Sequence, residues 1–276
     1  MKPQIWCCWI ALLTAISISA ADQWKLAWSD EFDYTGHPDP KRWTNEVGFI
    51  RNQEAQYYTA NRLENARVEN GKLIIEARKE QFRNAAHRDG SRDWRRVKFA
   101  EYTSAALTTQ GLKEFRYGRI EVRAKLPQGR GVWPAIWMLG VDRRAGWPRC
   151  GEIDIMEYVG FEPNVIHANI HTGKYNHVRG TGKGSRITIE KPYAEFHNYA
   201  IEWFPDRIDF FVDDKKYFTY TKEPNAGRDV WPFDEPQYLL LNFAIGGAWG
   251  GQKGIDESIF PQRYEIEYVR TYEIAN

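Results

Sequence analysis

Alternation of apolar and polar residues with a period of two runs through this chain and constrains its fold more than any other feature. The alternating segments are 73–77, 118–126, 165–171, 199–203, 208–212 and 264–269. Successive side chains of a β-strand point to opposite faces, so a half-buried strand shows this period, whereas a helix repeats about every 3.6 residues. The chain therefore predicts many strands, and no segment shows a comparable helical pattern.

Turn-forming residues separate these segments. They include Asn70-Gly71, Pro205-Asp206 and Asp213-Asp214, as hairpins and short loops require. Segment 238–245 is almost continuously apolar, which suits a strand buried on both faces. With no repeat or Pro/Ser linker, we expect one domain over residues 22–276, folded as an all-β, two-sheet antiparallel sandwich.

Residues 1–20 have the pattern of a secretory signal peptide. Lys2 gives a positive start, 5–18 is apolar, and small residues follow at 19–21. The alternative is a membrane anchor, but the apolar run falls short of the roughly 20 residues that span a bilayer. We therefore expect a secreted protein, periplasmic or extracellular, with no membrane association after cleavage.

Net charge and cysteine content exclude further classes of protein. Loss of Lys2 with the signal takes the formal net charge from +1 to 0, which does not indicate binding to nucleic acid or to an anionic membrane. Cleavage also removes Cys7 and Cys8 and leaves Cys150 alone, so no internal disulfide can form. Its apolar neighbours favour a buried packing residue over a nucleophile.

Three acids in segment 151–158 are the strongest functional signal. Strict alternation places Glu152 and Asp154 on one strand face and Glu157 on the other. A one-residue β-bulge near Ile155 and Met156 would return Glu157 to the first face, and bulges are frequent beside active sites. Three acids on one face repel one another, so we expect a functional role; a solvated strand edge or a cation site are the alternatives.

Tryptophans near these acids suggest a surface for sugar rings. Alternation places Trp133 and Trp137 on one face with Ala135 between them, as a stacking platform or as core. Trp147 and Trp249 have glycine and proline neighbours that mark loops, where an exposed indole is harder to explain as packing.

Polar residues alternate in two further segments. His167, Asn169 and His171 share a strand face, and they fit polar groups of a cleft better than a metal site. A second alternating set could place amides where sugar hydroxyls need partners: Asn52, Glu54 and Gln56.

Segment 151–158 resembles the signature of the family-16 glycoside hydrolases, in the bulged E-x-D-x-x-E form found in bacterial laminarinases. The resemblance extends in order over nearly the whole mature chain, through 30–32, 52–59, 102–105, 115–127, 133–139, 171–172, 196–213 and 260–272. It implies a β-jelly-roll sandwich with a concave substrate-binding sheet. It also implies retaining endo-hydrolysis of β-1,3-glucan.

The resemblance assigns Glu152 as nucleophile, Glu157 as acid/base and Asp154 as the assisting carboxylate. Retaining hydrolysis needs two carboxyl groups about 5–5.5 Å apart, which same-face positions across one bulge can supply. We expect the pKa of Glu157 to be raised toward neutrality while Glu152 stays ionised.

The resemblance also implies substrate-binding residues: the cleft aromatics Trp133, Trp137, Trp147 and Trp249, the sugar contact Asn52, and His171 near the acid/base. Where many relatives read Y-T-S-A-R, this chain has Ala106, so an arginine contact at the non-reducing side is absent. No lysine or arginine occurs among these aligned cleft positions, which argues against sulfated substrates.

The family often holds a structural Ca²⁺ away from the cleft. The corresponding ligands are Glu31, the backbone carbonyl of Gly71, and Glu267 in place of a usual Asp; calcium accepts oxygen ligands flexibly. Catalysis itself is expected to need no cofactor.

Three hypotheses for function follow. The first is a monomeric, exported endo-β-1,3-glucanase whose partner is a polysaccharide. The second keeps the reaction but changes the polymer, to mixed-linkage β-1,3-1,4-glucan or a marine galactan. The third is a non-catalytic glucan-binding protein, disfavoured because both catalytic glutamates are present.

Overall fold

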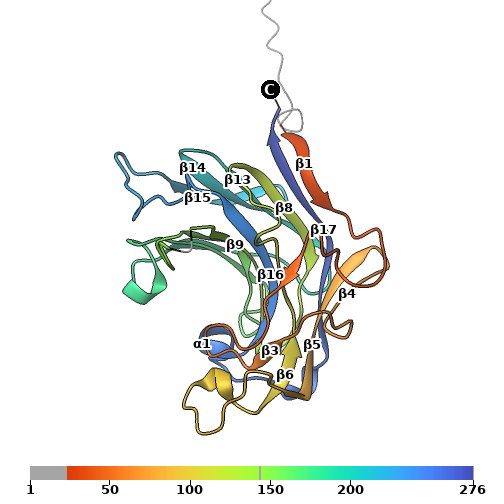
Figure 1. Cartoon of the computed structure of the whole chain (residues 1–276). Helices are drawn as coiled ribbons and strands as arrows, with labels where there is room; N and C mark the ends of the chain where they lie inside the picture. Colours follow the sequence, from red (N-terminus) through yellow and green to blue (C-terminus); the bar gives the residue numbers. More distant parts are fainter. Residues whose placement is uncertain (1–23, 143, 276) are drawn as a thin grey trace, which may run out of the picture.

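The computed structural model describes residues 24–142 and 144–275, so the predicted signal peptide lies outside the described residues. Within them, two curved sheets pack face to face (Figure 1). Nearly all strand pairs are antiparallel, the exception among named pairs being β3 with β6. The expected two-sheet sandwich is confirmed.

The outer sheet has ten strands, with β15, β14, β13, β8, β17, β5, β6 and β3 side by side, β1 joined to β17, and β4 joined to β5. Their bounds are β1 Trp24–Asp30, β3 Gln56–Tyr58, β4 Ala66–Glu69, β5 Lys72–Arg83, β6 Phe99–Ser104, β8 Gly118–Lys125, β13 His197–Trp203, β14 Arg207–Val212, β15 Lys215–Thr221 and β17 Gln262–Ile274.

The inner sheet has seven strands in the order β12, β11, β10, β9, β16, β7, β2. Their bounds are β2 Thr44–Asn45, β7 Ala106–Thr108, β9 Val132–Gly140, β10 Glu152–Glu157, β11 Val165–His171, β12 Lys183–Thr188 and β16 Gln237–Ile245. Helical turns are short: η2 Trp94–Arg96, η3 His177–Arg179, α1 Gly247–Gly250 and η4 Glu257–Ile259.

Every segment predicted from alternation corresponds to a strand, although 118–126 extends one residue past β8. The apolar segment 238–245 lies in β16, which is buried along its whole length. The main core fills the space between the sheets; Ile136 of β9 and Leu241 of β16 belong to it. Their neighbours in the sequence point the other way, onto the free face of the inner sheet. That face is concave (Figure 1).

Among the described residues, we find no helix with the length and apolar character needed to cross a membrane.

Candidate active site

Strand β10 contains the predicted bulge. Between Asp154 and Glu157 it advances three residues, whereas the neighbouring β9 advances only two, from Trp137 to Ala135. The register against β11 shifts over the same interval. Ile155 and Met156 point into the core, and Glu157 returns to the face of Asp154. The bulge therefore places all three acids on the concave face, as predicted.

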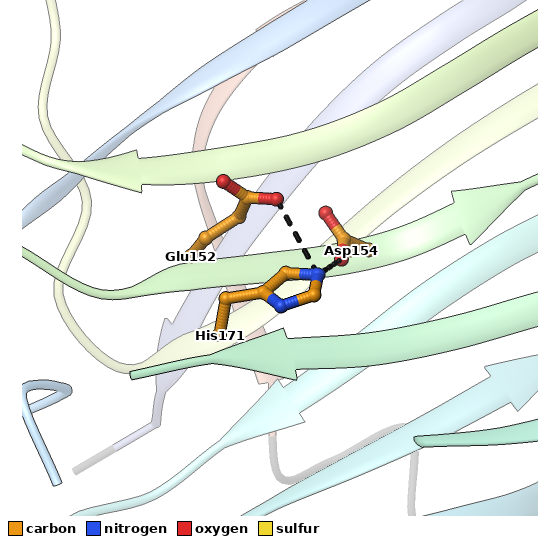
Figure 2. Close-up of side chains that lie close together, drawn as sticks. All are labelled: Glu152, Asp154 and His171. Carbon is orange, nitrogen blue, oxygen red and sulfur yellow. Dashed lines mark ion pairs between the residues drawn. The ribbon is translucent and has the colours of Figure 1, made fainter. Parts of the chain in front are cut away.

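His171 of β11 lies beside Glu152 and Asp154 (Figure 2). Its Nε2 is 3.2 Å from Oδ2 of Asp154 and 3.7 Å from Oε1 of Glu152. Asp154 is almost completely buried. His171 acts on the charge of Glu157 as well, in line with the expectation that it lies near the acid/base, but its ion-pair contacts are to the other two acids.

The two outer acids have different hydrogen-bond donors. Glu157 accepts from Nε1 of Trp133 at 3.1 Å and from Nδ2 of Asn169 at 3.1 Å. Glu152 accepts from Nε1 of Trp147 at 2.7 Å. No lysine or arginine of the described chain forms an ion pair with either acid, so neutral donors hold both carboxylates.

Burial raises the pKa of all three acids. For Glu152 the shift is large, and the charge of Asp154 adds to it while His171 opposes it. The pKa of Asp154 is also raised strongly, by burial and then by Glu157. For Glu157 burial again dominates, opposed by His171 and by the bonds from Trp133 and Asn169.

The prediction that the pKa of Glu157 is raised is confirmed, and the pKa of Glu152, which was expected to stay ionised, is raised as well. Sequence separation alone cannot reveal that all three carboxyl groups are removed from water together. Because like charges this close disfavour one another, the cluster retains protons at a pH where isolated carboxyl groups would be fully ionised.

The acids line a cleft of about 510 Å³ on the concave face. Its other walls come from β9, β16, the loop before β3 and the loop at η3. The lining residues are Ile50, Arg51, Asn52, Glu54, Trp133, Ala135, Trp137, Leu139, Trp147, Glu152, Asp154, Glu157, His177, Val178, Asn242 and Ala244. A mixed apolar and polar cleft of this size is typical of a small-molecule or sugar site.

The four predicted tryptophans differ in what they offer to a ligand. Trp147 is 43% exposed, and Trp133 and Trp137 are 9% and 8% exposed. Trp249 is not part of the cleft lining; it packs edge-on against Trp133, with ring centres 5.6 Å apart, and against His167 at 5.0 Å. Trp249 therefore supports Trp133, contrary to the expectation of an exposed indole in its loop.

Arg51 was not predicted, yet it lines the cleft. Its guanidinium carbon lies 4.9 Å from the centre of the Trp137 ring, and it forms an ion pair with Glu46. Trp137 is therefore partly covered by a cation and is a poor stacking platform. No lysine or arginine occurs among the aligned cleft positions, but Arg51 lies just outside them, because alignment to a motif does not reveal which loop side chains fold over the cleft.

Of the three alternating polar residues before and within β3, Asn52 and Glu54 line the cleft and Gln56 does not. Asn52 lines the cleft, with a positive φ of 56°. Gln56 is buried, and its amide donates to Oε2 of Glu54 at 2.7 Å while its oxygen accepts from the backbone N–H of Ile245. Gln56 thus stabilises the cleft wall and is unavailable to a sugar hydroxyl.

Cys150, just before β10, is buried as predicted. Burial and the nearby charge of Glu152 raise the pKa of its thiol to about 11. The thiol stays protonated near neutral pH, so it is not a candidate nucleophile.

Comparison with known proteins identifies the family. Residues 53–270 match the glycosyl hydrolases family 16. The chain belongs to glycosyl hydrolase family 16. It is 50% identical over 262 residues to a β-glucanase of Rhodothermus marinus, covering 91% of this chain and 86% of the relative.

Solved family-16 structures share the fold. The X-ray structure of the laminarinase from Rhodothermus marinus matches with a TM-score of 0.83 at 48% identity, covering 92% of this chain and 98% of that one. SCLam, a non-specific endo-β-1,3(4)-glucanase of the same family co-crystallised with 1,3-β-D-cellotriosyl-glucose, matches with a TM-score of 0.83 at 47% identity over 91% of this chain and 95% of its own. The chain is thus a family-16 glycoside hydrolase, and these hydrolases need no cofactor.

One group of side chains in the described residues could bind a metal ion: ligand atoms of Glu152, Asp154 and His171 lie within 4.8 Å of one another. Two carboxylates and an imidazole are a donor set for a transition metal rather than for calcium. In this structure the three side chains contact one another directly, with Nε2 of His171 within 3.7 Å of both acids.

The predicted calcium ligands lie in one region of the outer sheet but do not fit the ion. Glu31 accepts three hydrogen bonds from Arg270, at 2.9, 3.2 and 2.7 Å. Glu267 accepts from Arg123 at 2.6 Å. Both carboxylates are thus already neutralised by guanidinium groups, which would also repel a divalent cation. With its two charged ligands engaged, the carbonyl of Gly71 alone would not hold calcium.

Proposed function

We propose that this chain is a retaining endo-β-1,3-glucanase that acts on laminarin-type β-glucans. The observation that carries the proposal is the bulge in β10, which brings Glu152 and Glu157 into one cleft with separate donors. Likeness to the laminarinase and β-glucanase relatives supports the choice of polymer.

The chemistry assigns one role to each acid. Glu157, whose pKa burial raises, gives its proton to the departing glycosidic oxygen. Glu152 attacks the anomeric carbon, and water then hydrolyses the glucosyl ester after Glu157 has taken up a proton from that water. Two inversions leave the configuration unchanged.

Asp154 and His171 position the nucleophile. Asp154 is hydrogen-bonded to Glu152, and this bond lowers the pKa of Asp154 against the effect of burial. His171 contacts both acids, and its charge favours an ionised Glu152. His171 thus opposes the burial and the Asp154 charge that would otherwise keep Glu152 protonated and unreactive.

A second substrate is supported by one relative. SCLam is a non-specific endo-β-1,3(4)-glucanase, and it is 47% identical to this chain. Mixed-linkage glucan is therefore the alternative polymer. We further propose that the enzyme acts as a monomer after export, with no nucleic acid or membrane partner.

Product analysis on laminarin, lichenan and agarose, assayed side by side, tests the function. We expect β-anomeric laminarioligosaccharides as the initial products from laminarin, followed by proton NMR. Activity on lichenan alone would reject the linkage, galactose oligomers would reject the sugar, and initial α-anomers would reject the mechanism.

A further inference from the structure

The free face of the inner sheet extends beyond the cleft. Strands β7 and β2 lie outside β16, yet the cleft lining ends at Asn242 and Ala244 of β16. Ala106 of β7 pairs with Asn242, so its side chain points to the same concave face. Ala106 is nevertheless fully buried. A group from elsewhere in the chain therefore covers the sheet at this end.

Two residues before β3 reach this position. The backbone N–H of Glu46 donates to the carbonyl of Ala106 at 3.0 Å. The carboxylate of Glu46 forms an ion pair with Arg51, and each of the two side chains is 23% exposed. Because Arg51 lines the cleft while Glu46 is bonded to β7, the pair lies where the cleft ends.

Packing holds Arg51 in this position. Its guanidinium lies over Trp137, whose Nε1 donates to Oδ1 of Asn242 at 2.7 Å. Asn242 in turn donates to the hydroxyl of Tyr58 at 2.9 Å, and that hydroxyl donates to Glu54. Burial would lower the pKa of Arg51, but the surrounding acids outweigh it and the pKa is raised, so the guanidinium stays charged.

The opposite end of the cleft has no such cover. There Trp147 is 43% and Val178 71% exposed, and both line the cleft beside His177. A sugar chain that leaves the acids in this direction meets apolar, accessible side chains. A chain that leaves in the other direction meets an ion pair fixed to the sheet.

We propose that Arg51 and Glu46 form a barrier that ends the substrate cleft at β16 and limits how many glucose residues bind on that side of the cleaved bond. The proposal rests on the glucanase function proposed above. It makes Arg51 a specificity-determining residue: it sets the length of glucan bound at one end and takes no part in bond cleavage. β-1,3-Glucan chains then bind with more residues at the Trp147 end than at the Arg51 end.

Laminarioligosaccharides of increasing length, labelled at the reducing end, test this in the wild-type enzyme. As glucose residues are added on the Arg51 side of the cleaved bond, kcat/KM should stop rising sooner than when they are added on the Trp147 side. In Arg51→Ala, glucose residues added on the short side should gain new contacts with the enzyme. The KM of long oligosaccharides should then fall by about three- to tenfold with kcat nearly unchanged, because each new contact stabilises the bound substrate and the transition state equally.

Arg123→Ala is the matched control, since Arg123 also pairs with a glutamate but lies on the outer sheet. It should leave the length profile as in the wild type. A symmetrical wild-type profile, or a folded Arg51→Ala enzyme with an unaltered profile, overturns the barrier. A KM that rises equally for every length would instead make Arg51 a direct sugar ligand. If the wild type cleaves no β-glucan, the proposed function itself fails, and the barrier with it.

Discussion

Both sheets bury acidic side chains, but only the outer sheet surrounds them with cations. Glu76 of β5 is almost completely buried and pairs with Arg67, Arg78 and Arg263, the first and last at 3.0 Å. Asp154 of the inner sheet is equally buried, and a histidine is its only ion-pair partner among the described residues. The same burial thus occurs in two different electrostatic settings.

The pKa values respond to this difference. Burial alone would raise the pKa of Glu265 on the outer sheet, but hydrogen bonds from Lys125 and Lys72 outweigh it and the pKa is lowered. Burial also acts on Glu152, where no lysine or arginine opposes it, and the pKa is raised. Buried acids that pair with lysine or arginine are typical of a structural role. Buried acids without such partners are typical of catalytic sites.

The largest expected effect is on turnover. Glu152→Ala and Glu157→Ala should each lower kcat on laminarin by about 10³-fold or more, because one removes the nucleophile and the other the proton donor. Circular dichroism should show an unchanged fold. An aryl laminarioside with a good leaving group needs no proton, so Glu157→Ala should keep its first step and Glu152→Ala should not. Near wild-type rates on laminarin in either variant would remove the assignment.

The next effect is on stability and concerns the outer sheet. Glu76→Gln keeps the shape of the side chain but leaves Arg78 and Arg263 without a paired carboxylate, while Arg67 keeps its ion pair with Glu69. We expect the free energy of unfolding to fall by about 1–3 kcal/mol, measured by denaturant titration, because breaking a buried pair leaves charge uncompensated. Activity on laminarin should stay at the wild-type level. An unchanged unfolding free energy would mean that the paired and unpaired acids are energetically alike.

The matching substitution of a buried acid on the inner sheet, Glu152→Gln, should raise stability instead of lowering it. The folded-state pKa of Glu152 is raised, so folding favours its protonated form, and the resulting destabilisation grows as pH rises above the unfolded-state value. Glu152→Gln should therefore raise Tm by about 2–4 °C at neutral pH and leave it unchanged near pH 4. Thermal melts at both pH values measure this. A gain that is independent of pH would show that charge is not the cause.

The strands of both sheets and the shared face of the three acids could be predicted from the sequence. Alternation predicts the strands, and three acids spaced by one and then two residues require a bulge to share a face, which the register of β10 confirms. These features are local, because a strand face depends only on neighbouring positions. The resemblance to family 16 added the roles of the acids.

Features that depend on distant contacts could not be predicted in the same way. Arg51 reaches Trp137 across 86 positions of sequence only because the loop before β3 folds over the inner sheet. From its neighbours in the sequence, Trp249 is expected to be an exposed loop indole, but in the fold its ring packs against Trp133 and His167. The pKa of Glu152 likewise depends on how completely the neighbouring strands exclude water. Each of these required knowledge of which side chains the sheets bring together.

The smallest expected effect returns to the outer sheet and its predicted calcium site. Because Arg270 and Arg123 already neutralise Glu31 and Glu267, we expect Tm to be the same in excess chelator and in millimolar calcium. Replacing Arg270 with Ala frees the carboxylate of Glu31, so any calcium-dependent gain in Tm should be confined to that variant. A fall in Tm of the wild type on chelation would show that an ion can displace the guanidinium groups. A bound metal ion would then supply part of the stability of the outer sheet. The acids of the two sheets would differ in whether they bind a metal ion, rather than in whether they pair with lysine or arginine.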